Sequence, residues 1–440
     1  MFNRNTCARS AFTLRASSIL LVSCLFTTAN AQIDPGARAD KAAGDALSGI
    51  SQQQLNLFNQ AKSTFSEVDD VTSGLGPRFN ADSCATCHAF PAVGGSSPAS
   101  NPQVRFVNAK NALPPFVRAN GPVVEARFIS NPDGTRDGGV HALFTVDGRR
   151  DSPPGCSIPQ ENFSNAVNIS LRIPTPTFGL GLVEAISDAT LVKNLALNAG
   201  AKAALGIFGK LNRNGNDGGV TRFGWKAQNK SLQIFAGEAY NVEQGVTNLV
   251  FPNERDDTAS CYAAASPNDS IHLESNGTMD LLDDATQFAM FMRLLAAPAR
   301  GPIDSTVTQG ANQFTAIGCA NCHTATLVTG TSGFGAGLSN QTIHPYSDFA
   351  VHKMGPGLAD HISQGSAGGD EFRTAPLWGL GQRLFFLHDG RATDLLQAIL
   401  AHASGSNKEF PDSEANSVIA NFTALSTSDK QAVLNFLRSL

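Results

Sequence analysis

Apolar residues recur at helical spacing in several parts of the chain, and each such stretch predicts an amphipathic helix. Residues 51–66 and residues 302–316 each place apolar side chains on one face. Residues 425–440 do the same after a helix-capping sequence that begins at Ser426. In residues 279–299, methionines share the apolar face, and at this spacing we expect them to be core residues rather than ligands.

The chain between residues 120 and 150 shows a different pattern. Short apolar runs alternate there with the turn sequences NPDGT and VDGRR, which predict short β-hairpins. Further on, Pro298 and the sequence RGPIDS interrupt the helical pattern, so we expect a domain boundary near residue 300. The sequence therefore predicts a mainly α-helical chain in two domains, residues 32–300 and residues 301–440, with the hairpins in the first.

Residues 1–31 have the composition of a secretion signal peptide. Three arginines precede the apolar run SSILLVSCLF, and the small-residue sequence ANA ends at Ala31. The apolar run is too short for a permanent membrane-spanning helix, and no later run is long enough to be one. We expect an exported, periplasmic protein cleaved after Ala31, and the sequence LVSC leaves lipid attachment at Cys24 as an alternative.

The composition of the 440-residue chain suits a globular protein, with 42% hydrophobic and 16% charged residues. Its 41 glycines and 22 prolines indicate a loop-rich fold. Loss of residues 1–31 changes the formal net charge from −5 to −8, because that segment holds three arginines and no acidic residue. An acidic chain binds nucleic acid poorly, so we expect no nucleic-acid partner.

Six of the eight cysteines lie beyond residue 31. Four of these six belong to two C-x-x-C-H motifs, which comprise Cys84, Cys87 and His88, and Cys319, Cys322 and His323. A phenylalanine precedes the first cysteine of each motif by five positions, Phe79 in one case and Phe314 in the other. The two remaining cysteines, Cys156 and Cys261, are expected to form a disulfide bond in an oxidising compartment.

The histidine directly after each C-x-x-C pair distinguishes between three uses of such a pair. A zinc site would need both pairs together and would leave the histidines without a role. A thioredoxin-like redox disulfide would need a surrounding strand–helix pattern, which this sequence lacks. The presence of two copies also argues against it. Covalent attachment of haem c uses both thiols on the vinyl groups of the porphyrin and the histidine as an iron ligand. The two motifs therefore predict two covalently bound haem c groups.

Several longer sequences resemble those of a known family. The stretch FRTAPLWGLGQRLFFLHDGRATDLLQAILAH is similar to the C-terminal signature of bacterial di-haem cytochrome c peroxidases. HPYSDFAVHKMGPGLAD resembles related di-haem oxidoreductases, some of them called thiol oxidoreductases, and RIPTPTFGLGLVEAI and RFGWKAQNKSL fit the same family. The resemblance covers roughly residues 50–440. It implies two cytochrome c-like haem domains, the first enlarged by an insertion, since the motifs lie 235 residues apart.

The resemblance also implies ligands for the two irons. In the peroxidases, the distal ligand of the C-terminal haem follows the histidine of an HDG motif by fourteen residues. Here His388 begins HDGRA, and His402 lies at the implied position, with His388 itself and Met354 as alternatives. The distal histidine that the family places shortly after the first motif is missing, because the next histidine after His88 is His141. The N-terminal iron is therefore expected to keep an open or water-bound position.

Catalytic residues follow from the same resemblance. The family places a glutamate above the reactive iron, in a stretch similar to NVEQGVT, so Glu243 is the implied acid–base group. Glu184 in GLVEAI is the alternative, since its apolar neighbours would raise its pKa if it were buried. Trp225 matches the tryptophan between the two haems, and His352 is interpreted as structural.

These features predict an exported di-haem c-type peroxidase. Hydrogen peroxide, or else oxygen, would react at the N-terminal haem, and the C-terminal haem would relay electrons from a small redox protein such as a cytochrome c or a cupredoxin. Two alternatives remain open from the sequence, namely an electron-transfer cytochrome without catalysis and a haem oxygenase or protein-modifying enzyme. The resemblance also implies a calcium ion between the domains, and nothing in the sequence predicts the oligomeric state.

Overall fold

The helices predicted from apolar spacing are present in the computed structural model, which describes residues 32–39, 43–270 and 282–440. They are α1 (Gln52–Ser66), α7 (Asp284–Leu294), α8 (Ser305–Ala316) and α11 (Thr427–Ser439). Residues 279–281 of the predicted 279–299 helix lie outside the described residues. The four predictions are therefore confirmed for the residues that the structure describes.

Side-chain caps fix where the outer helices begin. Ser51 and Gln54 form a reciprocal capping box at the start of α1, because each side chain bonds the backbone N–H of the other residue. At the start of α11, the Ser426 hydroxyl accepts from the backbone N–H of Asp429 (3.1 Å) and donates to the Asp429 carboxylate (2.7 Å). The cap predicted at Ser426 is present. Its Asp429 carboxylate accepts from the Ser426 hydroxyl, whereas a reciprocal capping box uses the backbone N–H of the first residue.

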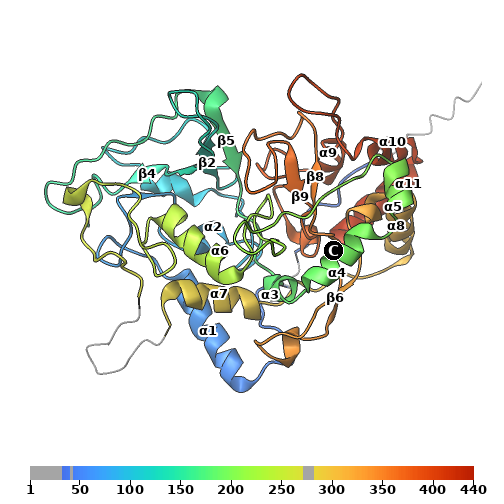
Figure 1. The fold of residues 1–440 in the computed structure, drawn as a ribbon, viewed down its shortest axis with the longest axis horizontal. Helices are drawn as coiled ribbons and strands as arrows, with labels where there is room; N and C mark the ends of the chain where they lie inside the picture. The colour runs from blue at the N-terminus through green and yellow to red at the C-terminus, as the bar shows by residue number, and fades with distance from the viewer. Residues whose placement is uncertain (1–31, 40–42, 271–281) are drawn as a thin grey trace, which may run out of the picture. The chain divides into compact units, whose positions relative to one another are not determined.

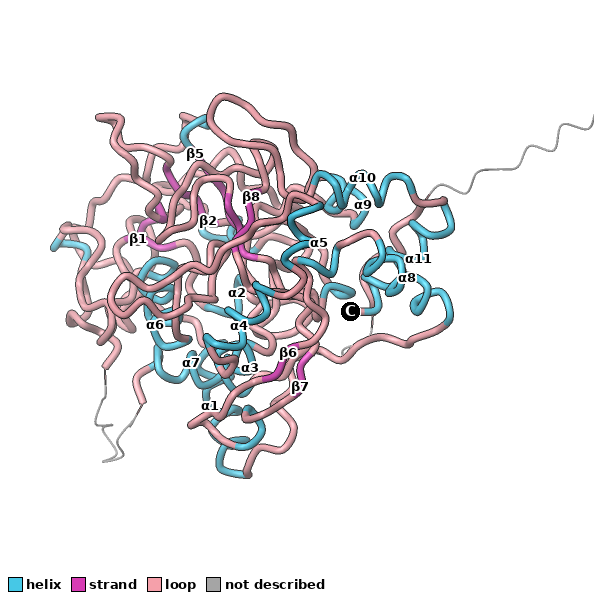
Figure 2. The backbone as a smooth tube through the Cα atoms, turned by 45° about the vertical axis from the view of Figure 1, so that its right-hand side comes forward, coloured by secondary structure: helices cyan, strands magenta, loops and turns pink. Residues whose placement is uncertain are grey.

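The remaining regular elements are short, and loops and turns make up most of the backbone (Figure 2). The other helices are α2 (Cys84–Cys87), α3 (Leu180–Glu184), α4 (Asp188–Ala196), α5 (Ala199–Ala204), α6 (Leu232–Ala239), α9 (Leu395–Leu400) and α10 (Asn416–Ala424). The strands are β1 (Arg78–Phe79), β2 (Glu125–Phe128), β3 (Val140–His141), β4 (Phe144–Thr145), β5 (Ile169–Arg172), β6 (Leu327–Val328), β7 (Thr342–Ile343), β8 (Val351–Lys353) and β9 (Glu371–Arg373). Among these regular elements helix predominates over strand, and the sheets are small, as predicted.

The small sheets only partly follow the predicted hairpins. β2 pairs antiparallel with β3 across the NPDGT turn, which confirms one hairpin, and β2 also pairs with β5. β4, which precedes the VDGRR turn, pairs with β1 instead of a neighbouring strand. The prediction of a second hairpin was therefore wrong. The partner of β4 lies more than sixty positions upstream, and the sequence around β4 gives no indication of so distant a strand.

Two helical clusters hold most of the core. In the first, α1 packs against α7, and Phe65 contacts Phe291 with ring centroids 4.7 Å apart (Figure 1). In the second, α8 packs against α11, and Phe314 contacts Phe436 at 5.2 Å. Each cluster contains the helix that precedes one C-x-x-C-H motif.

Residues 32–440 form one compact unit, so the boundary expected near residue 300 stays a prediction.

The Sγ atoms of Cys156 and Cys261 lie at bonding distance, as the cysteine count predicts. Within the described ranges, no helix combines the length and the apolar character needed to cross a bilayer.

Candidate haem sites and active site

The first C-x-x-C-H motif forms the short helix α2 and lines a cavity. Cys84, Cys87 and His88 border about 1110 Å³ of empty space that is partly open to solvent. The Nδ1–H of His88 donates to the carbonyl oxygen of Gly95 (2.9 Å), which leaves Nε2 free as a ligand. Because protein encloses the ring, the pKa of His88 is lowered, and the imidazole is neutral, as iron ligation requires.

The second motif lines a second cavity of about 1340 Å³, also partly open to solvent, with Cys319, Cys322 and His323 on its wall. The Nδ1–H of His323 donates to the carbonyl oxygen of Tyr346 (2.9 Å). Burial lowers the pKa of His323 to about 4. The two motif histidines therefore share one arrangement, in which a backbone carbonyl fixes the ring and Nε2 stays available.

The phenylalanines that precede the motifs do not play equivalent roles. Phe314 on α8 lies beside His323, with ring centroids 6.0 Å apart. Phe79 belongs to β1 and packs against Phe106 at 5.2 Å. The ring beside His88 is that of Phe65 on α1, at 6.1 Å. The shared five-residue spacing is therefore not a structural repeat, because α8 leads directly into the second motif whereas a long loop and β1 separate α1 from the first.

His402 lies just beyond α9 and lines the same cavity as His323. Its Nδ1–H donates to the carbonyl oxygen of Ala398 (2.7 Å), so Nε2 is free. Enclosure lowers the pKa of His402, and His402 in turn contributes to the lowered pKa of His323. The two alternatives, His388 and Met354, line this cavity as well.

The environment of His388 differs from that of His402. Its ring stacks on Phe372, with centroids 4.3 Å apart and planes 20° from parallel. Burial lowers the pKa of His388 to about 4. Within the described ranges, no hydrogen bond of the His388 ring fixes its tautomer. His402 therefore resembles the two motif histidines more closely than His388 does.

Two buried arginines also line the second cavity. Arg373 is 7% and Arg383 is 8% exposed. Burial lowers the pKa of Arg383 to about 10, and burial together with the nearby Arg383 lowers that of Arg373 to about 10, so both side chains are cationic at neutral pH. Nε and Nη2 of Arg383 have no hydrogen-bond partner in the part of the chain that the structure describes. Buried cations without a partner are costly, so this wall is suited to an anionic ligand.

Glu243 lies on the π-helical turn η3 (Tyr240–Gln244) and lines the first cavity. Its backbone carbonyl accepts from the N–H groups of Asn80 (2.6 Å) and Ala81 (3.3 Å), just ahead of Cys84. Burial and the carboxylate of Glu125 raise the pKa of Glu243 well above its usual value. The raised pKa favours the protonated form of Glu243, which is the form that a general acid requires.

Trp225 borders both cavities and is 8% exposed. Its indole Nε1–H donates to the carbonyl oxygen of Ile173 (2.9 Å), which fixes the ring. The edge of the indole faces His388, with ring centroids 6.4 Å apart. Among the residues singled out from the sequence, Trp225 alone lines both cavities.

Glu184 is not among the residues that line either cavity. On α3 its carboxylate accepts from Arg293 Nε (2.7 Å) and from the backbone N–H of Leu232 (2.8 Å). These bonds tie α3 to α7 and α6, which suits a structural role better than that of an acid above an iron.

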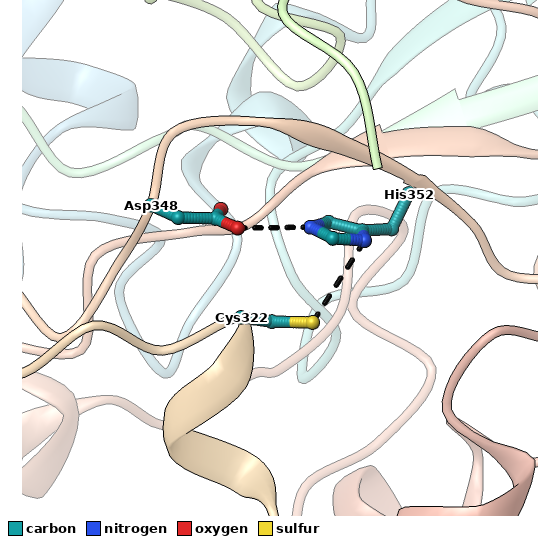
Figure 3. Close-up of side chains that lie close together, drawn as sticks. All are labelled: Cys322, Asp348 and His352. Atoms are coloured by element: carbon teal, nitrogen blue, oxygen red, sulfur yellow. Dashed lines mark hydrogen bonds and ion pairs between the residues drawn. The ribbon is translucent and has the colours of Figure 1, made fainter. Parts of the chain in front are cut away.

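His352 lies between Asp348 and Cys322 (Figure 3). Its ring nitrogens hydrogen-bond with Asp348 (3.0 Å) and Glu414 (2.9 Å), and the Sγ of Cys322 lies 3.8 Å from Nδ1. Two carboxylates therefore fix the ring, which agrees with the structural role expected from the sequence. Calcium prefers an all-oxygen site, so this group is not the calcium site that the resemblance implies.

Comparison with known families identifies the class of protein. A family model described as "Di-haem oxidoreductase, putative peroxidase" matches residues 125–440. The chain belongs to this family. The resemblance read from the motifs is thereby confirmed, and the protein is an enzyme of the di-haem oxidoreductase class.

Two solved structures are distantly similar to this di-haem oxidoreductase. A MauG-like protein associated with microbial copper homeostasis is 14% identical, with a TM-score of 0.29 over 66% of this chain and 95% of that one. A variant of the diheme peroxidase BthA from Burkholderia thailandensis is 14% identical, with a TM-score of 0.32 over 87% of this chain and 85% of that one. No curated protein matches the chain.

The two cavities fit the two haems that the family implies. Each combines two cysteines, a histidine with a free Nε2, and a mostly apolar wall. The unpartnered Arg383 in the second cavity suits a carboxylate such as a haem propionate. Three residues that line the first cavity also carry a buried polar atom without a partner in the described part of the chain, namely Ser83, Arg172 and Gln244.

The sequence did not reveal three residues of these cavities. Arg373 and Arg383 lie within the quoted C-terminal signature, but an arginine among apolar residues gives no signal of its own. Glu125 is the first residue of β2, and Glu243 lies more than a hundred positions further along the chain. Its partner becomes apparent only when the fold brings β2 beside η3.

Proposed function

We propose that the protein is an exported di-haem c-type peroxidase that reduces hydrogen peroxide at the first cavity with electrons relayed through the second. The observation that carries this proposal is the difference between the cavities. Among the described residues that line the first cavity, His88 is the only histidine, and Glu243, whose pKa is raised, lines the same space. The second cavity holds His323 and His402 together.

The attachment residues have separate roles in this proposal. Cys84 and Cys87 would hold one haem, and Cys319 and Cys322 the other, by thioether bonds. His88 and His323 would each ligate an iron through Nε2, and His402 would supply a second protein ligand to the iron that His323 holds. A haem iron with an open position supplies peroxide binding and reduction, whereas one with two protein ligands supplies electron transfer.

Glu243 would move a proton between the two oxygen atoms of the peroxide. Its carboxyl group would donate its proton to the outer oxygen, which leaves as water, and would recover a proton from the inner oxygen. The carboxyl thus returns to its starting state. Two electrons relayed from the redox partner and two protons from solvent would convert the inner oxygen to the second water. Arg127 and Arg172 line the same cavity and add positive charge to the wall.

Trp225 and the two buried arginines complete the proposal. Trp225 borders both cavities and would lie on the electron path between the haems. Arg373 and Arg383 would neutralise the propionates of the second haem. A small redox protein in the periplasm would supply the electrons.

Steady-state peroxide reduction with an added reduced cytochrome c tests the proposal. We expect Glu243→Gln to keep both haems and to slow the reaction by about 10²–10⁴-fold, the usual contribution of a positioned acid–base group. Glu161→Gln is a matched control, because Glu161 pairs with His141 and does not line either cavity.

Two results would contradict the proposal. A wild-type rate in Glu243→Gln would remove Glu243 as the acid. A wild-type protein that transfers electrons but does not turn over peroxide would favour an electron-transfer cytochrome.

A further inference from the structure

A second carboxyl group faces the first cavity beside Glu243. Glu125 is the first residue of β2, and its side chain is 16% exposed. Its carboxyl hydrogen-bonds with that of Glu243. Two carboxyl groups can hydrogen-bond directly only if one of them carries a proton, because two carboxylates have no donor between them. With the pKa of Glu243 raised and that of Glu125 lowered, the pair holds one proton more readily than two or none.

Contacts on β2 decide which member of the pair is ionised. Arg127 Nε donates to the Glu125 carboxylate (2.7 Å), and Arg127 Nη1 donates to the carbonyl oxygen of Gly138 (2.9 Å) on the way to β3. Arg172 lies opposite Glu125 in the β2–β5 register and adds a second positive charge. Although burial raises it, the pKa of Glu125 is held below its usual value, chiefly by Arg127.

The positive charges of Arg127 and Arg255 oppose the raised pKa of Glu243, but they are smaller causes than burial and Glu125. Arg255 attracts the ionised form of Glu243, but it donates to the backbone carbonyls of Val242 and Val140. Glu238 acts on Arg127 and keeps it cationic. With Arg127 directly on Glu125, the negative charge stays on Glu125 and the proton stays on Glu243.

We propose that Glu125 is a positioning residue that accepts the hydrogen bond of Glu243 and so keeps the proton of Glu243 within the cavity, ready for transfer. This inference rests on the proposed acid–base role of Glu243 and adds a partner to it. Glu243 is anchored by its backbone carbonyl to Asn80, whereas its carboxyl is oriented from a different element, β2. The arrangement separates the negative charge, which Arg127 holds, from the proton that reacts.

Infrared spectroscopy of the haem-loaded protein without peroxide tests the pair directly. In wild type, the difference spectrum against Glu243→Gln should contain the C=O stretch of a protonated carboxyl at neutral pH. The subtraction removes other neutral carboxyls, such as Asp69, whose pKa burial raises to about 8. In the Glu125→Gln background, the same subtraction should show this band disappearing at a lower pH than in wild type, because the negative charge of Glu125 is gone while the burial of Glu243 remains.

Matched variants separate the effect of the negative charge of Glu125 from the effect of a hydrogen-bonding side chain at this position. Glu125→Asp keeps the charge, so the band should persist to about the same pH as in wild type, with its frequency shifted by the changed hydrogen bond. Glu161→Gln should leave the band unchanged. In peroxide assays, Glu125→Gln should move the alkaline limit of the pH–rate profile down by about one unit or more, and Glu125→Asp should largely restore it.

Three results would overturn the inference: no neutral-carboxyl band of Glu243 in wild type, a band in Glu125→Gln that disappears at the wild-type pH, or the same downward shift in Glu125→Gln and Glu125→Asp. The infrared outcomes do not depend on turnover. A chain that shows the expected bands but no peroxide reaction would therefore contradict the proposed function and leave the carboxyl pair in place.

Discussion

Three histidines of this protein make the same hydrogen bond. In His88, His323 and His402, the Nδ1–H donates to a backbone carbonyl within 2.7–2.9 Å, and Nε2 is left free. This arrangement orients an imidazole as a metal ligand, and burial lowers the pKa of all three rings. Two of the three rings border one cavity. At the level of single residues, the proposed division of labour between the haems depends on where the third histidine lies.

Replacement of His402 tests this assignment. We expect His402→Ala to keep both haems and to convert the second from low-spin to high-spin in the ferric absorption spectrum, because one axial ligand is lost. His388→Ala should leave the spin states unchanged. His361→Ala is the surface control, since that ring pairs with the exposed Glu409. If His402→Ala leaves the spectrum unchanged while His388→Ala alters it, the ligand is His388, and Met354 is the candidate if neither does.

At the level of elements, close contact between α8 and α11 shapes the second cavity. Phe314 on α8 and Leu437 on α11 both line that cavity. A Cβ added at Gly310 on α8 would lie 1.9 Å from the backbone oxygen of Ala432 on α11. The contact therefore requires glycine at this position, because the neighbouring atom is backbone and cannot turn aside.

Gly310→Ala should lower the free energy of unfolding by about 1–3 kcal/mol, the usual cost of overpacking, and should perturb the spectrum of the second haem more than that of the first. Denaturant unfolding followed at both haem bands measures this. Gly200→Ala on α5 is a matched control, since nothing lies within 4 Å of an added Cβ there. That variant should keep or raise stability, by up to about 1 kcal/mol. Equal stability of the two variants would show that α8 and α11 can separate without cost.

The sequence predicts the local parts of this structure better than the long-range ones. The helices α1, α8 and α11 follow from apolar spacing, and the C-x-x-C-H motifs are contiguous, so their chemistry is visible without a fold. The β1–β4 pair and the carboxyl pair of Glu125 and Glu243 join segments far apart in the chain. No periodic pattern encodes such pairs, and the repeated phenylalanine shows that spacing alone can mislead.

At the level of the whole molecule, the two cofactors should be inseparable from the chain. Thioether bonds survive denaturation, so acid–acetone extraction of wild type should leave two haems per chain. A Cys84→Ala, Cys87→Ala double variant should retain one, because the second motif is intact. Haem content by the pyridine haemochrome method, together with the mass of the intact chain, measures this. Release of all haem from wild type would contradict covalent attachment.

A disulfide between Cys156 and Cys261 should close a loop across the first half of the molecule. The two residues are 105 positions apart, and a crosslink over such a loop contributes about 3–5 kcal/mol by constraining the unfolded chain. Peptide mapping without reduction should find the two cysteines joined. Two thiols that react with an alkylating reagent after denaturation would show that they are free.

The central claim is that the two haems of this protein differ in coordination. Electron paramagnetic resonance of the purified ferric protein tests it most directly, because high-spin and low-spin ferric haem give separate signals. We expect one high-spin signal from the haem at His88 and one low-spin signal from the haem between His323 and His402, in equal amounts. Two low-spin signals would contradict the account and would point to a further ligand in the first cavity, with Met292 on its wall as the residue to replace first.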